Sequence, residues 1–115
     1  MILGRDAILG AQDLTHEDVS VPEWGGTVRV RMMTGSERDA LASAFVGPDG
    51  KPDMSGYRHR LLAATMIDEA GARLFSPDDL AAIGAKSAAA LDRVFAAADR
   101  INQLGGQAVE TATGN

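Results

Sequence analysis

The sequence predicts an α+β fold that is mostly helical, with a small β-hairpin or three-stranded antiparallel sheet packed with about four α-helices. Three observations lead to this fold class. Apolar and polar residues alternate around Val19 and again around Val28, which indicates strands. Helix start signals lie at Thr34 and Ser76. From Leu91 onward, apolar residues recur at spacings of three and four, which indicates an amphipathic helix.

The N-terminal part is expected to form a short helix and then the hairpin. Residues 5–12 can form the helix, although Gly10 weakens it by about 1 kcal/mol relative to alanine. Strands are expected over 19–21 and 28–32, where valines alternate with polar residues. Residues 22–26 lie between them. Their proline removes a backbone donor and their two glycines permit positive φ, so an antiparallel hairpin is expected.

Two helices are expected in the middle of the chain. Thr34 and Glu37 have the spacing of a capping box, in which each side chain accepts a backbone hydrogen bond at a helix start. A helix is therefore expected over 35–46, with its apolar face on the sheet. Prolines and glycines are frequent in 47–53, which predicts a mobile surface loop. The second helix is expected over 54–67.

The C-terminal half is expected to add a third strand and two more helices. Residues 72–75 can form a brief strand beside the hairpin. Ser76 as N-cap and Pro77 at the first helical position, followed by two aspartates, predict a helix start. Gly84 can end that helix in the left-handed conformation. The longest helix is expected over 87–104.

The length of the chain corresponds to one domain. It has 115 residues, and domains cluster at about 100 to 150 residues. Residues 1–104 are assigned to this domain, and residues 105–115, which are small and polar, to a flexible C-terminal tail. Twenty of the apolar residues are alanine, so the core is expected to be thin. Self-association or a partner is therefore expected to supply part of the stability.

Charge and composition argue against several classes of function. The net charge of -5 disfavours attraction to phosphate backbones, so no nucleic acid is expected as a partner. The sequence shows neither a signal-peptide pattern nor a run of about 18 apolar residues, so neither secretion nor a membrane partner is expected. The absence of cysteine excludes disulfides, thiolate metal sites and cysteine nucleophiles.

No residue has a visible activating partner for catalysis. His16 and His59 do not have the spacing of metal ligands on one helix, and both are expected to be ordinary surface residues. Asp78 and Asp79 are better explained by a helix start than by acid–base chemistry. There is no Ser-His-Asp set, metal cluster or glycine-rich nucleotide motif. The prediction is therefore a protein that is not an enzyme and that needs no cofactor or metal.

Two features exceed what a small domain strictly needs. Trp24, in the hairpin turn, either covers the valine face or stands exposed as an interface anchor, and the covering role is preferred. Four methionines either fill gaps in the core, which is again preferred, or face a partner to which their thioethers adapt. They are Met32, Met33, Met54 and Met66.

Four segments in a fixed order resemble the tail assembly chaperones of long-tailed bacteriophages and prophages. They are V-P-E-W-G-G-x-V-x-V-R from Val21, T-G-x-E-R from Thr34, L-F-x-x-x-D from Leu74 and G-x-K-S-x-x-x-L from Gly84. The resemblance spans about residues 5–104. The ordered set is more specific than any one segment.

The resemblance implies a small protein of the host cytoplasm that binds and shields the tape measure protein, the long helical ruler of the tail. It also implies help in recruiting tail tube subunits and absence from the mature virion. The implied partners are thus the tape measure protein and the tail tube protein. Amphipathic helices need their apolar stripes covered until the tube surrounds them, and many weak contacts can cover them reversibly.

The resemblance further implies a longer form made by a minus-one ribosomal frameshift near the end of the gene. Thr113-Gly114-Asn115 can be encoded ACG-GGA-AAC, which contains the slippery string G-GGA-AAC, although other codons serve equally. The nucleotide sequence of these codons tests the hypothesis. The polar tail is then a linker to an extension that binds tube subunits.

Two alternative functions remain open. One is a structural neck or tail-completion subunit that stays in the virion, and the other is a small enzyme or regulator with a similar hairpin. For a binding function, apolar anchors on the turn and the last helix, with arginines on a strand, are the predicted partner contacts. These residues are Trp24, Arg29, Arg31, Leu91, Phe95 and Ile101.

Overall fold

The computed structural model describes residues 1–51, 53–54 and 56–104. The expectations about the tail at 105–115 and about the frameshift codons lie outside the described residues. The elements follow one another in this order: α1 (Arg5–Leu9), β1 (His16–Val21), η1 (Pro22–Trp24), β2 (Gly26–Arg31), α2 (Gly35–Ser43), α3 (Tyr57–Thr65), β3 (Met66–Ile67), η2 (Pro77–Asp79), α4 (Leu80–Gly84) and α5 (Ala88–Asn102).

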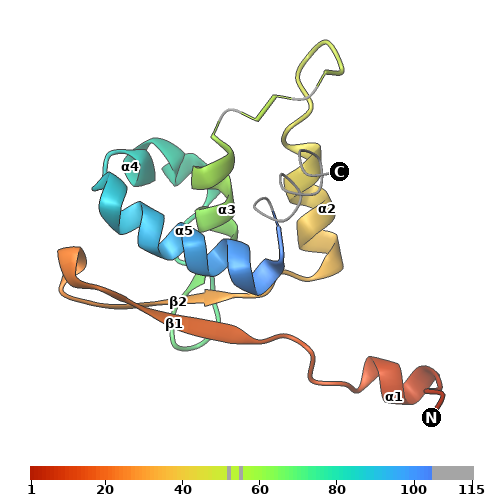
Figure 1. The fold of residues 1–115 in the computed structure, drawn as a ribbon. Helices are drawn as coiled ribbons and strands as arrows, with labels where there is room; N and C mark the ends of the chain where they lie inside the picture. The colour runs from red at the N-terminus through yellow and green to blue at the C-terminus, as the bar shows by residue number, and fades with distance from the viewer. Residues whose placement is uncertain (52, 55, 105–115) are drawn as a thin grey trace, which may run out of the picture.

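A three-stranded antiparallel sheet in the order β1-β2-β3 forms one layer of the fold. Helices α2 to α5 lie on one side of it, and α5 lies across the hairpin, where it packs against both β1 and β2 (Figure 1). Along β1, Glu17, Val19 and Val21 are at least half-buried and the residues between them are exposed, as strand alternation requires. The predicted α+β class is confirmed.

The hairpin has the predicted pairing but longer strands. Its register runs from His16 opposite Arg31 to Val21 opposite Gly26. The turn between the strands is a 3-10 helix followed by Gly25, whose φ of 71° is left-handed, so the expected use of glycine for positive φ is confirmed. The strands extend beyond the alternating valines because cross-strand polar pairs continue the ladder.

The third strand is Met66–Ile67, and the prediction of a strand at 72–75 is wrong. Helix α3 runs directly into β3, which pairs with β2. The side chain of Asp68 accepts hydrogen bonds from the backbone N–H groups of Ala70 and Ala72, at 2.8 and 3.0 Å, and this tight turn folds the chain back. Arg73 then makes only an isolated bridge to Ile67.

The two middle helices are shorter than predicted. The capping box at Thr34 and Glu37 is confirmed, but α2 ends at Ser43 and packs mainly against α3 rather than on the sheet. Helix α3 begins only at Tyr57, because Gly56 before it has a left-handed φ of 73°. It is the central helix, since its residues 61–65 are all buried.

The last two helices begin where predicted. Ser76 caps the 3-10 turn that leads into α4, and Ser87 caps α5, which is the longest described helix. Helix α4 ends at Gly84, but the left-handed terminator is wrong because φ is not positive there. Glycine leaves room for the His59 ring here, because a Cβ at this position would lie 2.9 Å from Cε1 of His59 and the ring would have to shift.

The core has two parts that share the side chains of α3 and α5. The first joins the sheet to α3, α4 and α5 and includes Val30 and Leu62; the second joins α2 to α3 and α5 and includes Leu41 and Leu61. Phe95 packs against both parts. The helices are therefore held to the sheet and to one another by one continuous layer of apolar contacts.

Candidate partner-binding surface

The two arginines predicted as partner contacts are both occupied within the chain. Arg29 forms a two-point contact with Asp18 across the hairpin, with Nε to Oδ1 at 2.7 Å and Nη2 to Oδ2 at 3.1 Å. This contact lowers the pKa of the Asp18 carboxyl from its usual value. Arg31 pairs with Glu37. Any partner must therefore compete for these guanidinium groups.

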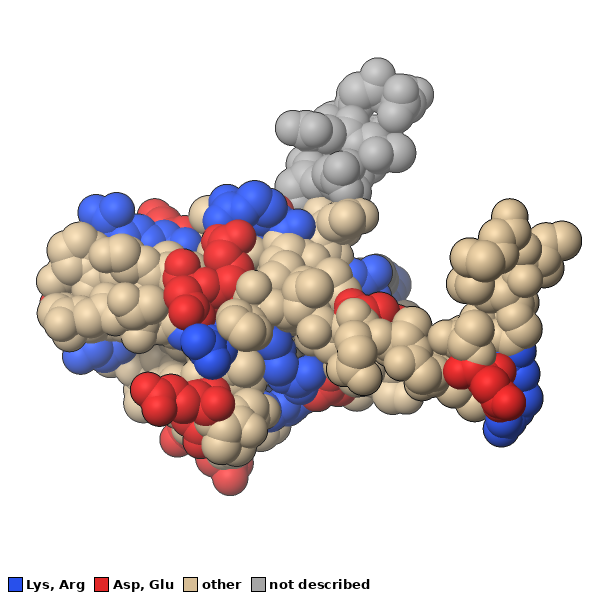
Figure 2. Space-filling view, turned by 90° about the horizontal axis from the view of Figure 1, so that it is seen from below, with Lys and Arg blue, Asp and Glu red and all other residues tan. Residues whose placement is uncertain are grey.

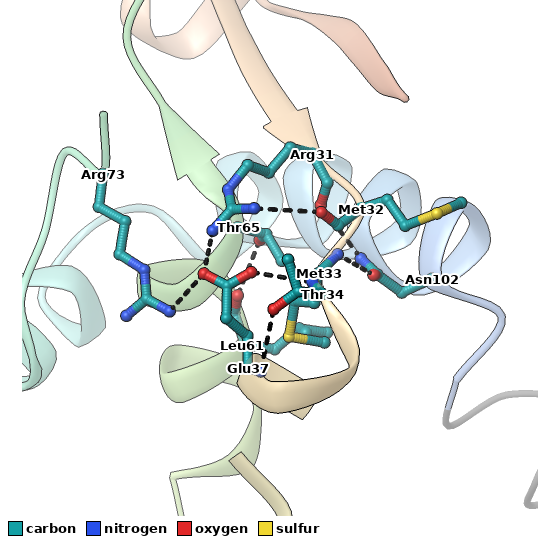
Figure 3. A network of polar contacts seen from close by, with 9 residues as sticks. All are labelled: Arg31, Met32, Met33, Thr34, Glu37, Leu61, Thr65, Arg73 and Asn102. Carbon is teal, nitrogen blue, oxygen red and sulfur yellow. Dashed lines mark hydrogen bonds and ion pairs between the residues drawn. The ribbon is translucent and has the colours of Figure 1, made fainter. Parts of the chain in front are cut away.

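Glu37 connects three segments of the chain (Figure 3). One carboxylate oxygen accepts from the Thr34 backbone N–H at 2.9 Å, and the other accepts from Arg31 and from Arg73. Burial alone would raise the pKa of Glu37, but the hydrogen bonds from Arg31, Thr34 and Arg73 outweigh it and lower the pKa to about 2. The carboxylate thus ties β2, α2 and the segment after β3 together.

The predicted aromatic and aliphatic contacts do not form one exposed patch. Trp24 is half-buried against the core, as its covering role requires, and Leu91 is only 4% exposed. Phe95 contacts Tyr57 edge-on, with ring centroids 6.1 Å apart, and lies 4.8 Å from the Arg58 guanidinium. Ile101 is half-buried in a separate depression near Met33. Their role in partner binding stays a prediction.

Two ion pairs join α5 to the hairpin. Arg93 contacts Glu23 at 2.9 Å in the hairpin turn, and Arg100 pairs with Glu17 at the other end of β1. The arginines are two helical turns apart and the glutamates six residues apart, so helix and strand run side by side in opposite directions. The predicted polar face of α5 is confirmed. Its ion-pair partners lie far away in the sequence, so spacing within the helix could not predict them.

The N-terminal arm, residues 1–14, projects away from the rest of the molecule (Figures 1 and 2). Its helix α1 has no buried residue. The arm carries six large apolar side chains that are at least half exposed: Met1, Ile2, Leu3, Ile8, Leu9 and Leu14. Sequence reasoning predicted the helix but not its exposure, since an apolar face looks the same whether or not the chain covers it.

A groove beside α2 adds a second apolar surface. This α2 groove has a volume of about 400 Å³, and nearly all of its lining is apolar. Met54 is 56% exposed at the groove, so the core assignment is wrong for this methionine and correct for Met33 and Met66, which are buried. The groove is lined mainly by Leu41, Ala42, Phe45, Val46, Met54 and Tyr57.

A smaller pocket, named here the Arg60 pocket, opens between α2, α3 and η2. Its volume is about 150 Å³. The walls are apolar, and three charged side chains stand among them: Glu37, Arg60 and Arg73. The remaining lining comes mainly from Ala40, Ala44, Ala63, Ala64, Pro77 and Leu80.

The described residues do not assemble a recognisable catalytic or metal site. Among them, no group of three or more His, Asp or Glu side chains could hold a metal ion. His16 is exposed as expected, but His59 is half-buried because its ring packs over Gly84, which corrects that expectation. None of the described helices combines the length and hydrophobicity needed to cross a membrane.

The fold and these surfaces define a small α+β domain with exposed apolar side chains on its arm and in its α2 groove. No protein-family model matches the sequence, and no curated protein matches it. Among solved structures, the chain is similar to the structure of the bacteriophage HK97 tail assembly chaperone. The match covers 87% of this chain and 95% of that chain, with a TM-score of 0.56 and 20% identity. The resemblance predicted from four sequence segments is confirmed for the fold.

Proposed function

We propose that this protein is a tail assembly chaperone that binds and shields the tape measure protein in the host cytoplasm. In this proposal it also helps to recruit tail tube subunits and does not remain in the mature virion. The similarity of the fold to the HK97 tail assembly chaperone over most of both chains is the observation that carries the proposal. The function is binding, without a chemical step.

The exposed apolar surfaces support this function. A tape measure helix with an apolar stripe needs a reversible cover. The arm and the α2 groove carry exposed apolar side chains that no other described part of the chain covers. Repeated weak contacts along one long ruler would give coverage through high effective concentration. Self-association through the same surfaces stays a prediction.

Coexpression with the tape measure protein of the same phage or prophage tests the proposal. We expect the tape measure protein to become soluble and to co-purify with this chain. The double variant Ile8→Ser, Leu9→Ser should reduce the yield of the complex, whereas Ser43→Ala, at an exposed position, serves as the matched control. A tape measure protein that stays insoluble beside the intact chain would contradict the function.

Mass spectrometry of purified virions separates the chaperone from a neck or tail-completion subunit. A chaperone should be missing from the particles although it is abundant in the infected or induced cell. Recovery at a fixed stoichiometry in mature particles would favour the structural subunit instead.

A further inference from the structure

Arg60 is a half-buried cation that has no counter-ion among the residues that the structure describes. Among the described residues, seven arginines form ion pairs and Arg38 donates to the backbone carbonyl of Asn102. Arg60 has neither kind of partner within this described part of the chain, although it lies in a mostly apolar pocket. A guanidinium in such surroundings gains free energy when a carboxylate reaches it.

The Arg60 pocket has the size for one side chain. Its volume of about 150 Å³ is below the roughly 300 to 1,000 Å³ of small-molecule sites. A cavity of roughly this volume holds one benzene molecule. The alanines of α2 and α3 leave this space, since larger residues at Ala40 or Ala63 would fill it. One aliphatic or aromatic side chain is therefore the fitting occupant.

The charges around the pocket favour an acidic neighbour for that side chain. One acidic and two basic residues line it, and both oxygens of Glu37 already accept hydrogen bonds. The whole chain has a net charge of -5, so an acidic segment is repelled in general and attracted at this place. Such local complementarity gives specificity and orientation.

We propose that the Arg60 pocket binds an acidic amphipathic helix of the tape measure protein. One apolar side chain of that helix enters the pocket, and an Asp or Glu about one turn away pairs with Arg60. This inference rests on the proposed function for the identity of the partner. The chemistry it selects, an apolar anchor beside a carboxylate, follows from the pocket itself.

Overlapping 20-residue peptides of the tape measure protein, measured by fluorescence anisotropy against the full chain, test the proposal. Peptides that bind should contain Asp or Glu three or four residues from a large apolar residue. Arg60→Gln should weaken their binding about tenfold. Arg58→Gln removes the same charge from the same helix outside the pocket, and it should leave binding within twofold.

Filling the pocket gives a second, independent variant. Ala40→Leu places a larger side chain into the pocket from an exposed position, so it should block binding while the thermal unfolding midpoint stays unchanged. Ala96→Leu, on the exposed face of α5, is the matched control. In a bound peptide, replacing the acidic residue by Lys should weaken binding to the intact chain. The same Lys peptide should bind the Arg60→Glu variant more tightly than it binds the intact chain.

The outcomes distinguish this inference from the function on which it rests. If the intact chain binds tape measure peptides and Arg60→Gln binds them equally well, the pocket assignment is wrong and the function stands. If the intact chain binds neither the peptides nor the coexpressed tape measure protein, the proposed function fails and the pocket assignment fails with it.

Discussion

The α5–hairpin region and the N-terminal arm use the same kinds of residue to opposite effect. In the first region, Val30 and Val94 are fully buried, and two ion pairs join α5 to the hairpin at the surface. In the second, Ile8 is 57% exposed and Leu9 67% exposed. The apolar residues of α5 stabilise the fold, whereas those of the arm are available to another molecule. Hydrophobicity therefore marks the core in one region and, in the proposed function, a binding surface in the other.

The same substitution in the two regions gives the largest expected difference. Leu62→Ala removes a fully buried side chain from the core and should lower the free energy of unfolding by about 3 to 5 kcal/mol. Leu9→Ala, on the arm, should change it by less than about 0.5 kcal/mol. Urea denaturation followed by circular dichroism measures both. Equal losses would show that the arm folds onto the domain in solution.

Asn102 gives the next largest effect, at the C-terminal end of α5. This side chain is 2% exposed and accepts from the Met33 backbone N–H at 2.8 Å (Figure 3). It also donates to the Ala98 carbonyl at 2.9 Å. Asn102→Ala removes these side-chain hydrogen bonds and leaves the buried Met33 N–H without its acceptor, so it should cost about 2 to 4 kcal/mol. The exposed Lys86→Ala is the control in the same denaturation assay, and a loss no greater than its own would refute the prediction.

Lowering the pH should weaken the contact between β2 and α2, because this contact depends on the ionised carboxylate of Glu37. The pKa of Glu37 falls from 4.5 to about 2 on folding, and its side chain is 22% exposed. This difference corresponds to ~3 kcal/mol of stability, present above about pH 4.5 and lost as the pH falls toward 2. Glu37→Gln should therefore be less stable than the intact chain at pH 7, with a difference that shrinks between pH 4.5 and 2.

Urea denaturation at several pH values checks this dependence on Glu37. Asp13→Asn, on the arm, removes a carboxyl that has no hydrogen-bond or ion-pair partner among the described residues, and it should leave the pH profile of the intact chain unchanged. A constant difference between the intact chain and Glu37→Gln across this pH range would contradict the assigned role of the carboxylate.

The ion pairs of α5 should give the smallest effect. The Arg100 side chain is 62% exposed and its Glu17 partner 35% exposed. Arg100→Ala should therefore cost less than about 1 kcal/mol, and the loss should shrink further in high salt. Thermal unfolding at low and high ionic strength measures it. A larger, salt-independent loss would mean that the aliphatic stem of the arginine packs on the hairpin.

Local patterns predicted the elements with strong signals, and tertiary contacts decided the rest. The alternating valines, the Thr34 capping box and Ser87 as a helix start correctly predicted the hairpin, α2 and α5. The third strand lies at a different place from the prediction because its position depends on the Asp68 turn and on which segment reaches the free edge of β2. Strand propensity at 72–75 does not contain that information.

The candidate site was less predictable than the fold. Leu91 and Trp24 are residue types that anchor interfaces, but a core needs the same types, and only the packing of the folded chain decides which of them are buried. That Arg60 has no ion-pair partner among the described residues could not be predicted from the sequence, since charge pairing depends on which helices meet. Only the capping-box spacing indicated beforehand that Glu37 would be held in place.

The bare backbone of Gly84 leaves room for an aromatic ring of the neighbouring helix. Its missing side chain lets the His59 ring lie against α4, so α3 and α4 approach closely. Leu80 of α4 and Ala63 of α3 are walls of the Arg60 pocket, so both helices that meet at Gly84 also line that pocket. Alanine at position 84 would force the His59 ring to shift, and because this ring belongs to α3 and contacts α4, the change tests how firmly the two helices pack without altering any residue of the pocket.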